Sequence, residues 1–389
     1  MKIAAIKPIF AQGEQRVFVF VKVETDQPGL IGWGEASLEG KPRAVAGCIQ
    51  DMEPMILGMD PRNVEHCWQI LYRSAFWRMG IIGLSAISGI DQALWDIKGK
   101  ELGRPVYELL GGKVRDRVRM YTHFGGDTPD AMAQDAASKV AKGWTAVKTV
   151  PVPITNIVDG IGVQKQAEAG LRAVREAVGD DIDILLDMHG RVTPQMAIQY
   201  ARRFEPYAPF FMEEPAQAEN PAAMAAIAKA TTIPIATGER LLTRWGFREI
   251  LETGAASLLQ PDTCHAGGIS EIRRIGALAE VYYAGMAPHN PYGPVSTAAC
   301  VQVDFAMPNF VIQEMVDPDT SPISMLEFVV EPLEVIDGHI LPPTKPGIGV
   351  EVDEVACLRR QPDFTSPRYG GQTVRWYSAV HKDGGVADS

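Results

Sequence analysis

The chain has 389 residues, of which 46% are hydrophobic and 22% charged, and its formal net charge is −11. This length exceeds one small core and suits a barrel of roughly 250 residues with a second domain. The acidic balance, with no basic run, argues against a nucleic-acid or an anionic-membrane partner.

Neither the first residues nor the cysteines point to export. The first 20 residues alternate like a strand and lack the pattern of a cleaved signal. No apolar run approaches the ~18 residues of a membrane-spanning helix. The five cysteines are widely spread and have no Cys-x-x-Cys spacing, which favours reduced thiols over disulfides or a zinc knuckle. We therefore expect a cytoplasmic protein.

Residues 1–35 have the pattern of antiparallel β structure. A β-branched and aromatic run over 16–25 is followed by a turn at 26–29. From about 42 to 110, apolar residues recur at spacings of three and four, as on one helical face; they include Leu84, Ile87, Ile90, Leu94 and Ile97. Gly111 and Gly112 then break the pattern. We predict an N-terminal α+β domain over residues 1–115.

From residue 118 onward, short apolar runs that end in a polar residue alternate with alanine-rich amphipathic segments. The predicted strands cover residues 119–123, 146–150, 182–187, 210–213, 235–239, 258–262, 283–289 and 310–314. Helices are predicted at 129–142, 163–178 and 194–204, with a short one between 289 and 310. Eight strands with intervening helices predict an α/β fold, a TIM (β/α)₈ barrel over residues 116–345. The irregular tail, about 346–389, is predicted to return to the N-terminal domain.

Three acidic residues lie at the ends of three successive predicted strands. Asp187, Glu213 and Glu239 follow one another at intervals of about 26 residues, close to one strand–loop–helix unit of a parallel barrel. Such barrels hold their catalytic groups at the C-terminal ends of the strands. Three carboxylates that converge repel one another, so a hard cation such as Mg²⁺ is the expected occupant. The sequence predicts a metal-dependent enzyme.

Neighbouring strand ends supply a candidate base and two further charged groups. Asp262 and His289 lie about one repeat apart, and a carboxylate bonded to one imidazole nitrogen makes a general base. Glu314 is predicted at the same mouth, where it could share a proton. Lys148 is a cation that could hold a substrate carboxylate against the metal.

A second histidine is predicted opposite the base. His189 follows Asp187 by two positions, so a strand that continued this far would point both side chains to one face. An elimination needs one group that removes a proton and another that protonates the leaving group. His189 and His289 fit these two tasks.

Each of these residues also has a structural interpretation, because an acidic residue at a strand end is most often a solvated cap. Glu214 is expected to form a structural ion pair, and His123 to be either a pocket or a packing residue. Asp91 and Asp96 are expected to be scaffold. His66, His265, His339 and His381 are expected to be structural or exposed. The functional interpretation rests on a coincidence: seven residues of types used in catalysis occur in barrel order, each at the end of a predicted strand.

The ordered set resembles the enolase superfamily, in its mandelate racemase-like branch. The resemblance is carried by Lys148, Asp187-x-His189, Glu213-Glu214-Pro215, Gly238-Glu239, Gln260-Pro261-Asp262, His289 and Glu314. Further shared segments are Gly-Trp-Gly-Glu from residue 32, His-Ala-Gly-Gly-Ile from residue 265 and Thr-Lys-Pro-Gly-Ile-Gly-Val-Glu from residue 344. The resemblance spans nearly the whole chain, and it is the combination of motifs that is specific.

The resemblance implies a fold, a metal and an assembly. The implied fold is an α+β capping domain over a modified TIM (β/α)₇β barrel, in which the eighth helix is absent or rearranged. The implied cofactor is one Mg²⁺ per subunit on Asp187, Glu213 and Glu239. Members of this family are commonly homo-oligomers, often octamers, so an oligomer is expected here as well.

The resemblance also implies a reaction. His289, oriented by Asp262, would remove the proton next to the carboxylate, and His189 would protonate the departing 3-hydroxyl. Lys148 and Glu314 would help to offset the charge of the enediolate. The implied activity is the dehydration of a sugar acid, with D-galactonate as the first choice, to a 2-keto-3-deoxy acid.

Val150 marks a departure from the racemases of this branch, which carry a second lysine at that position. Racemisation needs bases on both faces of the substrate, so it is disfavoured here. Two alternatives stay open: another enediolate reaction, such as cycloisomerisation or dehydration of a different acid, and a barrel that binds a sugar acid without turnover. His123, Asn290 and Tyr292 are expected in or near the pocket, together with segments around Glu39 and residues 76–78.

Overall fold

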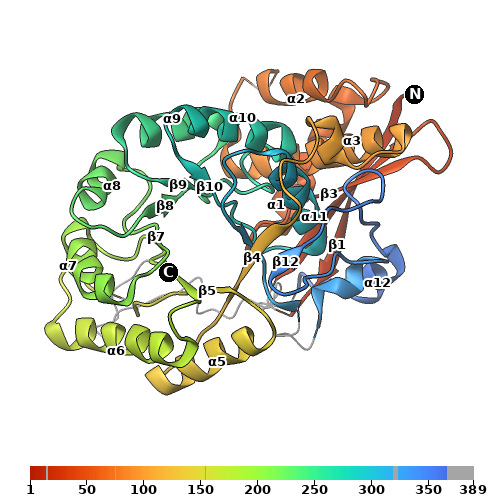
Figure 1. The fold of residues 1–389 in the computed structure, drawn as a ribbon. Helices are drawn as coiled ribbons and strands as arrows, with labels where there is room; N and C mark the ends of the chain where they lie inside the picture. Colours follow the sequence, from red (N-terminus) through yellow and green to blue (C-terminus); the bar gives the residue numbers. More distant parts are fainter. Residues whose placement is uncertain (15, 75, 154, 319–322, 366–389) are drawn as a thin grey trace.

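The computed structural model describes residues 1–14, 16–74, 76–153, 155–318 and 323–365. Figure 1 shows a ring of strands wrapped by helices, with a second, smaller layer of strands and helices against one side of the ring. His381 and the predicted tail beyond residue 365 lie outside the described residues.

The N-terminal layer is an antiparallel sheet with helices packed on it. Its strands are β1 (Ile3–Gln12), β2 (Val17–Thr25) and β3 (Ile31–Glu35), in the order β1-β2-β3. Its helices are α1 (Pro42–Ile56), α2 (Val64–Arg73), α3 (Gly80–Leu102) and the short α4 (Val106–Leu109). The five apolar residues predicted on one helical face are buried on α3. Glycines let β3 approach α3, because a Cβ on Gly34 would collide with the carbonyl oxygen of Gly89.

The second part is a parallel barrel. Its strands are β4 (Val118–His123), β5 (Ala146–Thr149), β6 (Asp183–Asp187), β7 (Phe211–Glu213), β8 (Ile235–Thr237), β9 (Leu258–Leu259), β10 (Gly285–Met286) and β11 (Gln313–Glu314). They pair in the order β10-β9-β8-β7-β6-β5-β4-β11, and a bridge between Met286 and Phe310 closes the ring. Each strand falls inside its predicted range, apart from one extra residue at the start of β4.

Seven helices follow the first seven barrel strands. They are α5 (Pro129–Ala141), α6 (Ile161–Val178), α7 (Pro194–Phe204), α8 (Pro221–Ala228), α9 (Thr243–Thr253), α10 (Gly268–Val281) and α11 (Pro294–Ala306). Four of them begin with proline, whose fixed φ and missing N–H suit the first helical turn. After β11, α12 (Glu354–Arg359) is the first α-helix among the described residues, and a 3₁₀ turn (Met325–Phe328) and β12 (His339–Ile340) precede it. The fold is therefore a (β/α)₇β barrel rather than a complete (β/α)₈ barrel.

The chain returns to the N-terminal layer after the barrel. The carbonyl oxygen of Arg360 accepts the N–H of Gln12 at 2.6 Å, and Glu354 pairs with Lys22 at 2.6 Å. The described part of the tail thus contacts β1 and β2 of the N-terminal layer. We keep residues 1–115 and 116–345 as our proposed domain bounds. None of the helices that the structure describes is long and apolar enough to cross a membrane.

Buried carboxylates of α3 join the N-terminal layer to the rest of the chain. Asp91 accepts the backbone N–H and the hydroxyl of Ser270 on α10, at 3.0 and 2.5 Å. Asp96 accepts the N–H groups of Trp33 and Ile348, each at 2.9 Å. Burial raises the pKa of Asp91 to about 7 and that of Asp96 to about 6. These contacts confirm the scaffold role predicted for the two acids.

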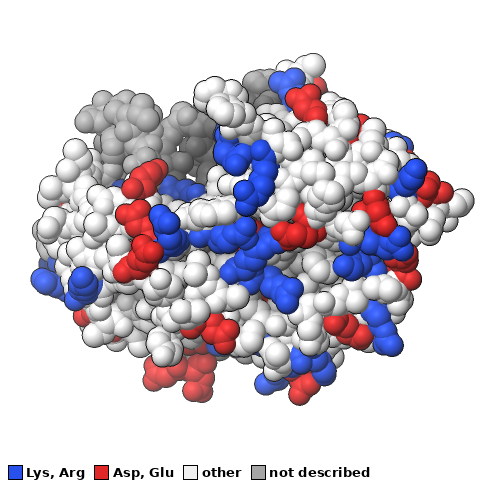
Figure 2. Space-filling view, turned by 90° about the horizontal axis from the view of Figure 1, so that it is seen from above, with Lys and Arg blue, Asp and Glu red and all other residues white. Residues whose placement is uncertain are grey.

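Figure 2 looks onto the side of the molecule where α2, α9 and α10 lie in Figure 1. Basic side chains gather across the middle of this face, with acidic side chains around them. Some of the charges in this part of the fold are paired: Glu271 of α10 forms ion pairs with Arg274 at 2.8 Å and with Arg244 of α9 at 3.1 Å. Local pairing therefore offsets part of the charge on these helices.

Candidate active site

A cavity of about 520 Å³ lies over the C-terminal ends of the barrel strands, beneath the N-terminal layer. Its floor comes from the barrel and its roof from the other domain, which contributes Arg16, Leu38, Glu39 and Ile81. From the barrel, the lining includes Lys148, Asp187, His189, Glu239, His289 and Glu314. Catalytic groups of parallel barrels lie at this end of the strands.

The structure brings Asp187, Glu213 and Glu239 together. Asp187 and Glu213 are the last residues of β6 and β7 and pair in register, and Glu239 follows β8 by two residues. One carboxylate oxygen from each lies within 4.8 Å of the others. The predicted convergence of the three acids is therefore present in the fold.

The chemistry of this triad fits a hard divalent cation. Glu213 is fully buried, and its Oε1 has no hydrogen-bond partner among the described residues. Burial raises the pKa of Glu213 to about 7 and holds that of Glu239 well above its usual value. Glu213 and Glu239 thus resist ionisation beside Asp187, so a positive charge would stabilise the cluster of three carboxylates, and oxygen donors are the ligands that Mg²⁺ prefers. The residues present therefore suit the metal that the sequence predicts.

Lys148 lies at the centre of the acidic cluster. Its Nζ is 2.6 Å from Glu314, 2.9 Å from Glu213 and 3.5 Å from Asp187. Although burial opposes it, the charges of Glu213 and Glu314 hold the pKa of Lys148 well above its usual value. The side chain is a fixed cation on the floor of the cavity.

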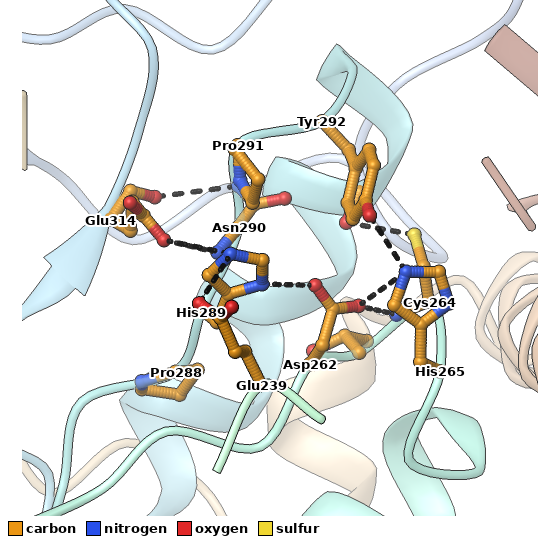
Figure 3. A network of polar contacts seen from close by, with 12 residues as sticks. Glu239, Asp262, Cys264, His265, Pro288, His289, Asn290, Pro291, Tyr292 and Glu314 are labelled. Carbon is orange, nitrogen blue, oxygen red and sulfur yellow. Dashed lines mark hydrogen bonds and ion pairs between the residues drawn. The ribbon is translucent and has the colours of Figure 1, made fainter. Parts of the chain in front are cut away.

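His289 and Asp262 form the predicted pair. His289 Nδ1 lies 2.6 Å from Asp262 Oδ2, and the other carboxylate oxygen accepts the N–H of Cys264 at 2.6 Å. Figure 3 shows Asp262 between His289 and the Cys264–His265 segment. An ionised Asp262 only accepts, so Nδ1 carries the proton and Nε2 is left to act as the base. That Nε2 faces Glu239, at 3.2 Å from its carboxylate.

His189 reaches the cavity by a different route from the one predicted. Strand β6 ends at Asp187, and His189 has a φ of +50°, so strand alternation does not orient its side chain. A left-handed turn does, and it brings the ring Nε2 to 3.1 Å from Asp187 Oδ2. The position expected for His189 is right, whereas the reason given for it is wrong.

Glu314 is held by three groups. Its Oε1 contacts Lys148 at 2.6 Å and His123 Nε2 at 2.5 Å, and its Oε2 accepts the N–H of Asn290 at 2.8 Å. Burial opposes ionisation, yet the charges of Lys148 and His289 hold the pKa of Glu314 well below its usual value. His123 is thus a pocket residue, the first of its two sequence interpretations.

Some residues of the cavity were not singled out by the sequence, and one expected segment is absent from it. Arg240 lines the cavity and pairs at 2.6 Å with Glu214, which has the predicted structural role. His265, expected to be structural, also lines the cavity. Phe76 and Trp77 are 86% and 80% exposed and do not line it. The only sequence signal for Arg240 was its place next to Glu239.

Comparison with known proteins agrees with this geometry. Residues 4–111 match the N-terminal domain of the mandelate racemase/muconate lactonizing enzyme family, and residues 131–356 match the enolase C-terminal domain-like family. A D-galactonate dehydratase of Variovorax paradoxus is 42% identical over 378 residues, covering 95% of this chain and 96% of that protein. One from Xanthomonas euvesicatoria is 41% identical with the same coverage.

Solved structures of enolase superfamily members have folds similar to that of this chain. An enolase superfamily member from Salmonella Typhimurium has a TM-score of 0.87 at 35% identity, over 92% of this chain and 98% of that one. An enolase from Agrobacterium radiobacter with bound sodium and L-malate has a TM-score of 0.89 at 34% identity, over the whole of both chains. The resemblance predicted from the motifs is confirmed, and the chain belongs to the mandelate racemase/muconate lactonizing enzyme branch of the enolase superfamily.

Proposed function

We propose that the protein is a Mg²⁺-dependent hydro-lyase that dehydrates a sugar acid to a 2-keto-3-deoxy acid, with D-galactonate as the first candidate substrate. The observation that carries the proposal is that His189 and His289 line one cavity beside a cluster of three carboxylates, of which Asp187 and Glu239 also line it. The D-galactonate dehydratases at 41% and 42% identity support this reaction and this substrate.

The proposed metal site consists of Asp187, Glu213 and Glu239, with one Mg²⁺ per subunit. When bound there, the metal supplies positive charge that stabilises the substrate carboxylate as it gains negative charge. Lys148 lies beside the acids and offsets part of the same charge, and Glu314 pairs with Lys148 at 2.6 Å and holds that cation in place.

The proton transfers belong to two histidines. His289 Nε2 takes the proton from C2, and Asp262 holds the imidazole in the required tautomer. His189 gives a proton to the 3-hydroxyl as the C3–O bond breaks, so that water leaves. The resulting enol then becomes the 2-keto-3-deoxy acid by tautomerisation. One proton and one hydroxyl leave the substrate, which balances the loss of one water.

Val150 limits the reaction at C2. It lines the cavity one residue beyond β5, and its isopropyl group has no proton to exchange. Racemisation through a second-face lysine is therefore disfavoured. Cycloisomerisation and binding without turnover find no specific support in the site, because neither requires an imidazole at position 189 beside the metal ligands.

A substrate panel tests the proposal. Purified protein with Mg²⁺ is incubated with aldonates and aldarates that differ at C4 and C5, and 2-keto-3-deoxy product is measured. Product from D-galactonate or a near epimer that disappears with EDTA and returns with Mg²⁺ supports the proposal. If no member of the panel gives product although Mg²⁺ binding is demonstrated, the proposed sugar-acid dehydratase activity is contradicted.

We further propose a cytoplasmic homo-oligomer, with an octamer as the first candidate. All five cysteines are buried and free, as suits a reducing compartment. Light scattering after size-exclusion chromatography measures the assembly, and a monomeric mass at micromolar concentration would contradict it.

A further inference from the structure

The loop that carries His289 is held by the N-terminal domain. We call residues 289–293 the base loop and residues 36–41, between β3 and α1, the cap loop. Arg16 donates to the carbonyl oxygen of Pro291 at 2.5 Å. Glu35 accepts the N–H groups of Gly293 and Ser296 at 2.9 Å each. The middle of the base loop and its C-terminal end are therefore held by a domain that is distant in sequence.

A third tie joins the two loops by side chains alone. The hydroxyl of Tyr292 donates to Glu39 Oε2, and Glu39 Oε1 in turn pairs with Arg16 at 3.0 Å. Tyr292 is 3% exposed. Burial and the charge of Glu39 raise the pKa of Tyr292 well above its usual value, so the hydroxyl keeps its proton.

Proton counting gives this network a direction. The single proton of Tyr292 goes to Glu39, so His265 Nε2, which lies 2.8 Å from the Tyr292 oxygen, must donate to it. His265 Nδ1 lies 2.8 Å from Ser85 Oγ, and the Ser85 hydroxyl donates to the carbonyl oxygen of Ile81 at 2.7 Å. The donors therefore run from His265 through Tyr292 to Glu39. Because His265 and Tyr292 belong to the barrel and Glu39 to the N-terminal domain, this buried chain needs the two domains in contact.

The tyrosine also contacts the base directly. Its ring lies edge-on to the ring of His289, with centroids 6.2 Å apart and planes at 86°. Figure 3 shows Tyr292 and His289 on the same segment, with His265 beside the hydroxyl. Glu39 and its neighbour Leu38 line the roof of the cavity. Tyr292 therefore contacts both His289 and Glu39, which lines the roof of the cavity.

We propose that Tyr292 is a positioning residue: its hydroxyl fastens the cap loop to the base loop, which fixes the roof of the cavity and the place of His289 together. Tyr292 does not touch the reacting atoms in this arrangement. Its effect on turnover rests on the proposed function, whereas its effect on the two loops does not.

Tyr292→Phe removes the hydroxyl and keeps the ring, and the chain offers a matched control. Tyr200 of α7 is also buried and donates to a carboxylate, Asp159, at 2.9 Å, but it does not line the cavity. Tyr200→Phe therefore removes the same kind of bond elsewhere. Hydrogen–deuterium exchange of the full-length variants is measured over peptides covering the cap loop and the base loop, together with their melting temperatures.

Faster exchange in both loops is expected in Tyr292→Phe only, at a melting temperature close to that of Tyr200→Phe. In turnover, kcat and C2 proton exchange should fall together by about tenfold or more, the factor carried by one hydrogen bond to a charged group. Equal exchange in the two variants, or a kcat unchanged in Tyr292→Phe, would overturn the proposal. If the wild-type protein turns over no sugar acid, the loop exchange still decides the role of Tyr292, and only the proposed function fails.

Discussion

His189 is bound twice to Asp187: its backbone N–H donates to Oδ1 at 2.9 Å, and its ring Nε2 lies 3.1 Å from Oδ2. The left-handed turn at His189 makes both contacts possible with one carboxylate. The proposed metal ligand Asp187 and the proposed general acid His189 are thereby fixed relative to each other. An imidazole held beside a metal-bound substrate is well placed to protonate a leaving hydroxyl.

Replacing His189 should slow the loss of the 3-hydroxyl without stopping removal of the C2 proton. In His189→Asn, dehydration is expected to fall by roughly 10²–10⁴-fold, the usual contribution of a general acid. Exchange of the C2 proton in D₂O should persist, since His289 is untouched. Both rates are measured on one substrate by NMR. Dehydration at the wild-type rate would contradict the assignment of His189 as the acid.

Replacing His289 should stop both removal of the C2 proton and loss of the 3-hydroxyl. His289→Asn keeps a polar group of similar size but has no basic nitrogen, so C2 exchange and dehydration are expected to fall together by at least roughly 10²-fold. The same NMR assay reports both. Retained C2 exchange in this variant would mean that another group removes the proton.

Asp262→Asn should keep the His289 imidazole in place but favour the wrong tautomer. An amide at this position can donate to His289 Nδ1, which would place the ring proton on Nε2, where the base must accept. We expect kcat to fall while the stability of the protein changes little, because the new side chain fills the same space. Full activity across the pH range would show that Asp262 does not determine the tautomer.

Glu213→Gln should weaken Mg²⁺ binding by more than the roughly 10–100-fold that follows loss of an outer-shell partner. Isothermal titration with Mg²⁺ measures the affinity. The neighbouring Glu214→Gln is the matched control, since Glu214 pairs with Arg240 rather than with the acidic triad. Equal affinity in the two variants would refute the proposed ligand set.

Asp91→Asn should flatten the pH dependence of stability between about pH 4 and pH 7. Burial raises the pKa of Asp91 from 3.8 to about 7 in the folded protein, so the folded state binds this proton more tightly than the unfolded chain. The resulting stabilisation is complete at low pH and is lost as the pH rises to about 7. Its slope is at most about 1.4 kcal/mol per pH unit. Urea unfolding at several pH values measures it.

Asp60→Asn is the control for this slope. The hydrogen bond from Arg62 lowers the pKa of Asp60 to about 2, so its contribution changes only below about pH 4. The curve of this variant should therefore run parallel to that of the wild-type protein above pH 4. If Asp91→Asn also ran parallel, Asp91 would not be the group that takes up the proton.

The sequence alone determined the barrel order and the site residues that lie on strands. Asp187, Glu213 and Glu314 end strands β6, β7 and β11, and Lys148 lies on β5. These positions follow from local patterns, because a short apolar run that ends in a polar residue marks the C-terminal end of a buried strand. Parallel strands then bring such ends to one face of the barrel without further information.

Only the tertiary structure decided how the side chains of the site are held. His189 depends on a left-handed turn, and His123 at the end of β4 lies in the cavity because its Nε2 donates to Glu314, 191 residues away. Tyr292 meets Glu39 across 253 residues. Such contacts leave no periodic signal, since their energy comes from polar groups that are buried together only when the chain is folded. The sequence determined which acidic, basic and histidine residues end the barrel strands, and the folded barrel together with the N-terminal domain decided how they are held.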